Sequence, residues 1–286
     1  MGVKSAVNAA LRRTTGLQLT RAGAGPARPG GTARPQRLEG DRLLERPAFI
    51  LSSVRSGSTL LRVLLDSHPL LHAPHELHLR DIAVGVTGQP AAKSLDELGL
   101  DAAHLEYLLW DRLLQREVQR RGKRFVVNKT PTDVFIADRI VECWPDARFL
   151  FLLRHPGSIV RSRAQARPQD SEERHVEMVL RYATGLEQAR AVHPGLVVRY
   201  EELTTDPAGQ LARVCEFLGV PYEPQMLDYG HFDHGRYRVG LGDWTEKIRS
   251  GEIHPAAPAP DTVPDGLRDL CEAWGYVPGR LASPRG

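Results

Sequence analysis

Short apolar segments alternate with amphipathic segments along most of the chain, and this alternation restricts the possible fold more than any other feature. The segments typical of buried strands are 48–54, 125–127, 148–153 and 196–200. The segments with helical periodicity are 58–65, 105–114, 134–141, 157–164, 172–192, 206–217 and 264–274. Strands that alternate with helices predict an α/β fold with a mostly parallel central sheet flanked by helices. Ligands of such sheets bind beyond the carboxyl ends of the strands, so we expect the chemistry there.

The N-terminal part of the chain has a different composition. Residues 14–37 are rich in Gly, Pro, Ala and Arg and contain no acidic residue. Such a segment cannot bury enough apolar surface to fold. We therefore expect a flexible, basic N-terminal segment over 1–42 and a single folded domain over 43–286.

Charge and cysteine content disfavour several classes of protein. The formal net charge of the 286 residues is +3 and the arginines are spread out, which disfavours nucleic acid as a partner. Three cysteines without CxxC spacing (Cys143, Cys215 and Cys271) disfavour a disulfide framework and a zinc site. No stretch approaches the about 18 consecutive apolar residues of a membrane span, so we expect a cytoplasmic protein without a membrane partner. The sequence makes no prediction of the oligomeric state.

The first strand leads directly into Arg-Ser-Gly-Ser-Thr at 55–59 and then into a helix. A Gly-containing turn at a helix N-terminus presents free backbone N–H groups and the positive end of the helix dipole, which makes a P-loop-like cradle for an anion. Gly57 lets the backbone approach a ligand closely, and Arg55 adds a positive charge. The turn lacks the length and the lysine of GxxxxGK[ST], so an ordinary serine-capped turn remains the alternative when the turn is considered alone.

Two further strand ends carry a cation. Strand 148–153 ends in Arg154, where a P-loop enzyme of phosphoryl transfer usually has an Asp that helps to hold Mg²⁺. A cation at that place binds an anion and repels a metal, and Ser162, eight residues further on, can join it at one phosphate. Lys129 follows strand 125–127 and would point into the same crevice, with a solvated surface lysine as the alternative interpretation.

Four segments, in this order, resemble the superfamily of sulfotransferases that use 3′-phosphoadenosine 5′-phosphosulfate (PAPS). FILSSVRSGSTLLRVLLDSHP resembles the 5′-phosphosulfate loop, and FLFLLRHPGSIVRSR resembles the 3′-phosphate motif with its Arg and Ser. VVRYEELTTDPAGQLARVCEFLGVP resembles the segment whose Tyr packs near the adenine, and RVGLGDWTEKI resembles the C-terminal Gly-Asp-Trp loop. The resemblance covers residues 47–277. It is closer to bacterial and tyrosylprotein-type members than to cytosolic aryl and steroid enzymes, which carry Lys at the places of Arg55 and Val239.

The resemblance implies an enzyme that moves a sulfuryl group from PAPS to a hydroxyl by in-line displacement without a metal, and releases adenosine 3′,5′-bisphosphate (PAP). It assigns Arg55 and Lys129 to the bridging and sulfonate oxygens, the backbone N–H groups of 56–60 to the 5′-phosphate, and Arg154 with Ser162 to the 3′-phosphate. The residues that it places at the nucleotide are Arg55, Ser56, Gly57, Ser58, Thr59, Leu60, Arg154, Ser162, Tyr200, Arg238, Gly240 and Trp244.

Sulfuryl transfer to a hydroxyl requires a general base. Glu76 stands 21 positions after Arg55, where the tyrosylprotein and bacterial polyketide-type members carry a catalytic Glu, so the resemblance favours Glu76. An ordinary Glu is a weak base, and Glu76 would need partial burial to raise its pKa. His75 and His78 remain alternatives, because histidine titrates near neutral pH without help.

Two other functions stay open at this point. A nucleotide or small-molecule kinase with a degenerate P-loop predicts a loop lysine and a carboxylate at a strand end, and the chain has neither. A non-catalytic nucleotide-binding module needs neither a base nor Lys129. The Arg, Ala, Gly and Pro content is typical of a GC-rich bacterial source, so we expect a small, natural-product-like hydroxyl acceptor from bacterial secondary metabolism. Residues 68–115, 165–175 and 222–240 are expected to form its pocket.

Overall fold

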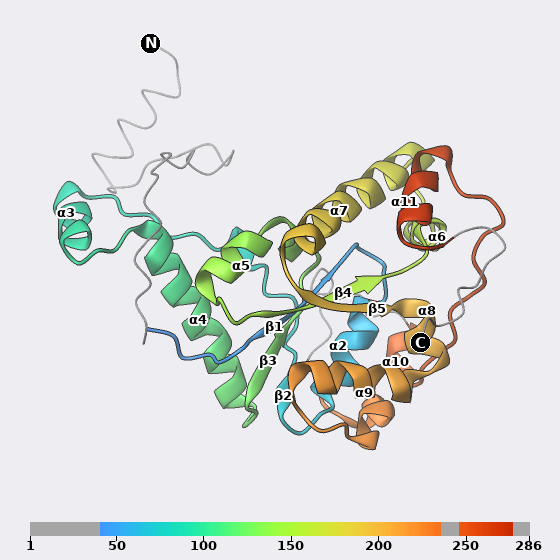
Figure 1. Ribbon diagram of the computed structural model, residues 1–286, viewed down its shortest axis with the longest axis horizontal. Helices are drawn as coiled ribbons and strands as arrows, with labels where there is room; N and C mark the ends of the chain where they lie inside the picture. The colour runs from blue at the N-terminus through green and yellow to red at the C-terminus, as the bar shows by residue number, and fades with distance from the viewer. Residues whose placement is uncertain (1–40, 236–245, 277–286) are drawn as a thin grey trace, which may run out of the picture. The chain divides into compact units, whose positions relative to one another are not determined.

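A computed structural model of the chain describes residues 41–235 and 246–276 (Figure 1). The predicted flexible segment lies almost entirely outside the described residues and stays a prediction. The same holds for Arg238, Gly240 and Trp244 of the expected C-terminal nucleotide loop. Among the described helices, none is long and apolar enough to cross a bilayer.

The described strands form one five-stranded sheet in which every pair is parallel, so the predicted fold class is confirmed. The strands are β1 (Ala48–Ser52), β2 (Leu71–His72), β3 (Phe125–Asn128), β4 (Arg148–Leu153) and β5 (Gly195–Arg199). Their order in the sheet is β2-β3-β1-β4-β5, which places β1 in the centre between β3 and β4. Strand β2 was not predicted, because two residues are too few to show a periodic pattern.

The two central strands are apolar on both sides because the sheet is covered on both faces. Alternate side chains of a strand point to opposite faces. Accordingly Phe49 and Leu51 lie in one buried cluster with Phe149, whereas Ile50 lies in another with Leu150. Helices α4 (Ala102–Arg120), α5 (Ala137–Cys143) and α7 (Glu172–Val192) contribute to the first cluster, and α2 (Ser58–Asp66) and α9 (Pro207–Leu218) to the second. Figure 1 shows α2 and α9 on the side of the sheet opposite to α4, α5 and α7.

The remaining described elements are short, and several differ from the prediction. They are η1 (Leu79–Asp81), α3 (Gln89–Glu97), η2 (Pro131–Phe135), α6 (Pro156–Ala166), α8 (Tyr200–Thr205), η3 (Pro224–His231), α10 (Glu246–Arg249), η4 (Asp265–Leu267) and α11 (Arg268–Ala273). The predicted helix 134–141 is divided between η2 and α5. Helix α3 was not predicted, because Leu95 is the one large apolar side chain among its nine residues and a single such residue shows no helical period.

The predicted start of the helix at 206 is confirmed in detail. Asp206 caps α9 by accepting a hydrogen bond from the backbone N–H of Gly209 at 3.0 Å. Pro207 occupies the first turn, where a missing N–H costs nothing. Because β1, β3, β4 and β5 run in one direction, the residues after each of them meet at one edge of the sheet.

Candidate active site

The turn after β1 is shaped by Gly57. Gly57 precedes helix α2 with φ 88° and ψ 14°, a left-handed conformation that favours glycine. A Cβ atom at this position would lie 2.1 Å from Cδ2 of Tyr200, so the site also leaves no room for a side chain. The helix begins at once, with Leu61 N–H bonded to Gly57 O at 3.2 Å, and the N–H groups of its first turn face the amino end of the helix. The turn therefore has the backbone geometry of an anion cradle.

The structure brings the two predicted phosphate motifs into direct contact. Arg154 Nη1 donates to the carbonyl oxygen of Arg55 at 2.9 Å, and Arg55 Nε donates to Ser162 Oγ at 3.2 Å. Burial lowers the pKa of Arg154, and the neighbouring Tyr200 and Glu201 oppose that shift. An arginine held in this way presents its charge in a fixed direction, as anion recognition requires.

Tyr200 lies between these motifs. Its ring centroid is 4.4 Å from the Arg154 guanidinium carbon, and its ring edge occupies the space beside Gly57. Tyr200 is the first residue of α8, directly after β5, so its backbone is fixed by the edge of the sheet. The ring therefore supports both the turn at 55–59 and the cation at 154.

A cavity of about 540 Å³ opens beside these residues, a size suited to a nucleotide-sized ligand. Its lining includes most of the predicted nucleotide residues, namely Arg55, Gly57, Ser58, Thr59, Leu60, Arg154, Ser162 and Tyr200. Ser56 is buried beneath the turn and is not part of the lining.

Residues that the sequence did not single out also line the cavity. Ser158, Arg161 and Gln165 come from helix α6, and Lys247 comes from α10. The three α6 residues follow Arg154 at 4, 7 and 11 positions, a helical spacing that could have revealed them. Arg161 adds a cation to the wall that carries Arg154 and Ser162.

The predicted catalytic Lys129 and Glu76 form an ion pair. Lys129 Nζ donates to Glu76 Oε1 at 2.5 Å and to Thr59 Oγ1 at 3.5 Å. Lys129 is 1% exposed, so it is not a solvated surface lysine. The Glu76 side chain is 11% exposed, and the expected partial burial is therefore found. Through Thr59, this pair reaches the first turn of α2.

The two alternative bases lie on the same loop as Glu76. The His75 residue is exposed, whereas His78 Nε2 lies 3.5 Å from Glu76 Oε2. The backbone N–H of His78 donates to Thr130 Oγ1 at 3.4 Å, which connects the loop with the residue after Lys129. Glu76 is thus the carboxylate buried against Lys129, and His78 is its neighbour.

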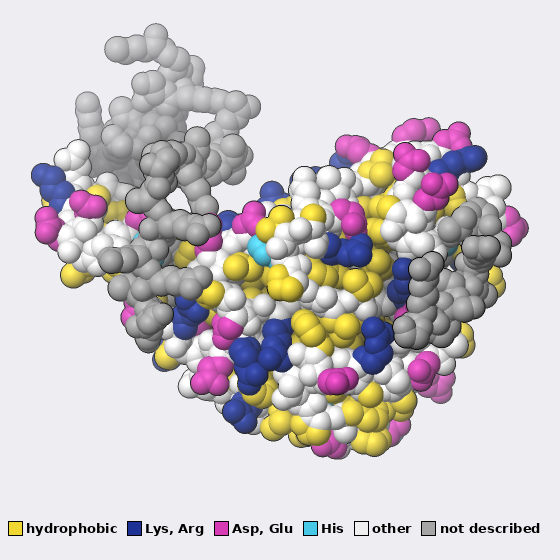
Figure 2. All heavy atoms as spheres, in the orientation of Figure 1, with side chains coloured by type: hydrophobic (Ala, Val, Ile, Leu, Met, Phe, Trp, Pro, Cys, Tyr) yellow, Lys and Arg dark blue, Asp and Glu magenta, His cyan; other side chains and the backbone are white. Residues whose placement is uncertain are grey.

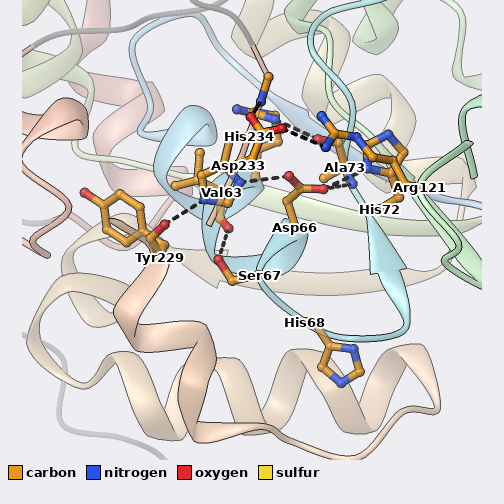
Figure 3. Close-up of polar contacts among 12 residues, drawn as sticks. Val63, Asp66, Ser67, His68, His72, Ala73, Arg121, Tyr229, Asp233 and His234 are labelled. Atoms are coloured by element: carbon orange, nitrogen blue, oxygen red, sulfur yellow. Dashed lines mark hydrogen bonds and ion pairs between the residues drawn. The ribbon is translucent and has the colours of Figure 1, made fainter. Parts of the chain in front are cut away.

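The two charged residues of helix α2, Arg62 and Asp66, hold the loop that carries Glu76. Arg62 Nη1 donates to the carbonyl oxygen of Ala73 at 2.7 Å, and the backbone N–H of Ala73 donates to Asp66 Oδ1 at 2.8 Å. Figure 3 shows Asp66 also bonded to His72 Nδ1 and His234 Nδ1, each at 2.8 Å. Burial alone would raise the pKa of Asp66, but the hydrogen bonds from both histidines lower it below its usual range. The loop at 73–78 is therefore fixed to α2.

Asp133 is a second buried carboxyl group near the ion pair, and sequence reasoning missed it. Its Oδ2 accepts a hydrogen bond from Asn128 Nδ2 at 2.8 Å, and burial, with a contribution from Glu76, raises the pKa of Asp133 to about 8. At neutral pH the Asp133 side chain is therefore mainly protonated and adds little negative charge near Lys129. Asn128 is the last residue of β3 and Asp133 lies in η2, so the turn from β3 into η2 brings these two side chains together.

The surface in the view of Figure 2 is mixed in character. A band of hydrophobic side chains crosses the middle of this face below helix α7, with Lys and Arg side chains along it. Most acidic side chains of this face lie outside the band.

Within the part of the chain that the structure describes, no group of three or more His, Cys, Asp and Glu side chains could hold a metal ion.

Comparison with known proteins identifies the class of enzyme that this fold and site define. The model of the sulfotransferase family matches residues 47–224, which is more than half of the chain. The chain belongs to the sulfotransferase family, as the sequence motifs predicted, and is a sulfotransferase-family enzyme.

Curated relatives and solved structures agree with this assignment. The nodulation protein NoeE of Sinorhizobium fredii is 27% identical over 225 residues, which cover 66% of this chain and 53% of that protein. The protein-tyrosine sulfotransferase of Drosophila melanogaster is 25% identical over 207 residues, which cover 66% of this chain and 41% of that protein. This chain thus spans about half the length of these relatives or less.

The fold is shared with sulfotransferase domains of known structure. The sulfotransferase domain of the Synechococcus PCC 7002 olefin synthase has a TM-score of 0.59 and 24% identity, covering 82% of this chain and 96% of that domain. The sulfotransferase domain of the curacin biosynthetic pathway has a TM-score of 0.57 and 23% identity, covering 82% of this chain and 99% of that domain.

Proposed function

We propose that the chain transfers a sulfuryl group from PAPS to the hydroxyl group of a small acceptor, in line and without a metal ion. The observation that carries this proposal is the hydrogen bond from Arg154 to the carbonyl oxygen of Arg55. This hydrogen bond joins the cation at the end of β4 to the glycine turn at the end of β1. At the end of the strand corresponding to β4, a Mg²⁺-dependent P-loop enzyme would need a carboxylate. PAPS supplies the activated sulfonate, and the protein supplies position and charge.

The nucleotide would lie in the cavity along α2 and α6. We assign the backbone N–H groups of 56–60 to the 5′-phosphate and Arg154 with Ser162 to the 3′-phosphate, because the cradle and the cation line one cavity. Tyr200 would pack near the base. Arg238, Gly240 and Trp244 would close over the nucleotide, and they lie outside the described residues.

Lys129 is the cation closest to the proposed base and would contact the sulfonate oxygens. A monoanionic sulfonate can be stabilised by fixed cations instead of a metal ion. Arg55 donates to Ser162 through Nε, and its Nη groups would contact the sulfonate. The Ser162 hydroxyl accepts that hydrogen bond and would donate its own hydrogen to the 3′-phosphate.

Glu76 would act as the general base, with His78 as the alternative. Its carboxylate takes the proton of the acceptor hydroxyl while the acceptor oxygen forms a bond to sulfur. The bond from sulfur to the 5′-phosphate oxygen breaks, and PAP leaves with the electron pair. Fixing donor and acceptor on one rigid helix and its attached loop supplies the orientation that such a displacement requires.

The test is a thermal-shift comparison of PAP with ATP–Mg²⁺, followed by a screen of hydroxyl acceptors with labelled PAPS. We expect PAP to raise the melting temperature and ATP–Mg²⁺ to have little effect. Stabilisation by ATP–Mg²⁺ alone would favour a kinase. Stabilisation by PAP without sulfate transfer to any acceptor would favour a nucleotide-binding module.

The kind of acceptor and the compartment are part of the proposal. The Arg, Ala, Gly and Pro content that suggests a GC-rich bacterial source supports a small, natural-product-like metabolite of bacterial secondary metabolism. The absence of a long apolar stretch in the sequence supports action in the cytoplasm. The labelled-PAPS screen tests the acceptor class directly.

A further inference from the structure

Two arginines from distant parts of the chain meet on one aromatic ring beside the Glu76 loop. The guanidinium carbon of Arg80, in η1, lies 5.2 Å from the ring centroid of Phe135, and that of Arg181, in α7, lies 5.3 Å from the same centroid. Arg80 and Arg181 are exposed, and Phe135 is partly buried at the end of η2. Three separate elements therefore gather two positive charges at one small area of the surface.

Within residues 41–235 and 246–276, these two guanidinium groups have no acidic partner of the kind that neighbouring arginines have. Among the described residues, Arg174 and Arg190 of α7 pair with Glu177 and Glu187 one turn away. Neither Arg80 nor Arg181 has an ion pair or a hydrogen bond with a described side chain, and each contacts the Phe135 ring instead. Both guanidinium carbons lie within 5.3 Å of one ring centroid, so an anion bound beside this ring would be attracted by both charges.

The arginine pair lies on the acceptor side of the proposed reaction. The ring of Phe135 is 5.1 Å from the ring of Tyr182, measured between centroids. Burial raises the pKa of Tyr182, while Arg181 and Arg80 lower it and Glu76 adds to the increase. Arg80 follows Glu76 by four residues on the same loop, and Phe135 ends η2, which begins two residues after Lys129, the partner of Glu76. A molecule whose hydroxyl group contacts Glu76 would therefore lie near this pair.

We propose that Arg80 and Arg181 bind an oxyanion group of the acceptor, a carboxylate or a phosphate, while Phe135 packs against the adjoining apolar part. This inference rests on the proposed function, because it takes Glu76 to mark the place of the acceptor hydroxyl. Guanidinium groups form paired hydrogen bonds with planar and tetrahedral oxyanions, and the contact of each with the Phe135 ring restricts its motion. The acceptor is therefore a hydroxylated acid, with its charged group set apart from the hydroxyl that is sulfated.

The experiment compares matched probes on matched variants. The probes are 4-hydroxyphenylacetate, its neutral analogue 4-hydroxyphenylacetamide, and 4-hydroxybenzylphosphonate as the phosphate-like arm. The variants are R80Q, R181Q and R80Q/R181Q, with R190Q as the control that removes a paired arginine of helix α7. Isothermal titration of PAP-saturated protein measures the affinity for each probe.

We expect the wild-type protein to bind at least one anionic probe about tenfold or more tightly than the amide. The double variant should lose this preference, the single variants should lose part of it, and R190Q should keep it. An equal preference in wild type and double variant, or no preference in wild type, overturns the proposal. If the double variant does not fold, R80K/R181K replaces it and should retain only part of the preference, since lysine keeps the charge without the fork.

The proposed function has a separate readout in the same experiment. If PAP fails to stabilise the wild-type protein, the assignment of the nucleotide is wrong. The titrations are then made on the protein without PAP. The same comparison of anionic and neutral probes then tests whether Arg80 and Arg181 bind an oxyanion.

Discussion

Lys129 Nζ lies 2.5 Å from Glu76 Oε1, and this ion pair joins the proposed sulfonate-binding cation to the proposed base. The lysine side chain is 2% exposed and the carboxylate 11%, so neither charge is well solvated. A buried charge that loses its partner destabilises a protein strongly. Substitutions that keep shape and hydrogen bonding are therefore the informative ones at this pair.

Glu76→Gln should lower turnover by about 10²–10⁴-fold, because an amide cannot take the proton of the acceptor. The thermal shift produced by PAP should stay near that of wild type, since Glu76 is not part of the cavity lining. Labelled-PAPS transfer measures the first quantity. The matched variants H75Q and H78Q should retain more activity, and near-normal turnover in E76Q with a large loss in H78Q would transfer the base role to His78.

Arg154→Ala should weaken PAP binding by about 10–100-fold, the effect of losing a charge-assisted hydrogen bond. The same variant should lose much less affinity for adenosine 5′-phosphate, which lacks the 3′-phosphate. Ser162→Ala should weaken the binding of PAP by a smaller factor than Arg154→Ala does, and it should not weaken the binding of adenosine 5′-phosphate. Titration calorimetry with the two nucleotides gives the comparison. Equal losses for both nucleotides would mean that Arg154 acts through the Arg55 turn and not on a 3′-phosphate.

Gly57→Ala should destabilise the protein more than Gly99→Ala does. Both glycines have positive φ, 88° and 69°, but a Cβ at 57 meets the Tyr200 ring whereas a Cβ at 99 has open space. The backbone term is about 1–2 kcal/mol for both, and crowding adds about 1–3 kcal/mol at 57. Urea denaturation measures the difference. Similar losses in both variants would show that Tyr200 moves aside at little cost.

Asp133→Asn should reduce the dependence of stability on pH. The pKa of Asp133 is raised to about 8 in the folded protein from an ordinary value of 3.8, so between these values the folded state binds one more proton than the unfolded state. Stability therefore falls as the pH rises, by at most about 1.4 kcal/mol per pH unit. The amide of the Asp133→Asn variant does not titrate, so its free energy of unfolding should fall less between pH 5 and pH 7. Denaturation at pH 5 and pH 7 tests it, with the exposed Asp265→Asn as control.

EDTA should leave sulfate transfer unchanged, because the anion contacts proposed here come from arginine, lysine and backbone N–H groups. The measurement is labelled-PAPS transfer before and after dialysis against the chelator. A loss of activity that Mg²⁺ restores would contradict the metal-free mechanism.

The sequence was sufficient to predict four of the five described strands, because buried parallel strands are nearly continuous apolar runs. The segment 148–153 coincides with β4, and the cations after β3 and β4 could be placed at one edge from strand direction alone. The glycine turn was recognisable because its conformation depends on local residues. Helix α8 was not predicted, since Tyr200 was expected at the end of a strand and instead begins a helix.

The parts of the site that could not be predicted depend on contacts between residues far apart in the chain. Asp66 and His234 are separated by 168 positions, and no local pattern relates them. Arg80 and Arg181 look like ordinary surface arginines until the fold brings both onto Phe135. Arg62 and Asp66 did carry a signal, because two charged residues four positions apart interrupt an apolar helix and need buried partners.

Helix α2 is connected to the Glu76 loop at both of its ends. Its last residue, Asp66, accepts a hydrogen bond from the backbone N–H of Ala73, three residues ahead of Glu76. At its first turn, Thr59 accepts a hydrogen bond from Lys129, which also bonds to Glu76. Substitutions elsewhere on the surface that leave these two connections intact should therefore leave the spacing between the proposed nucleotide cradle and the proposed base unchanged.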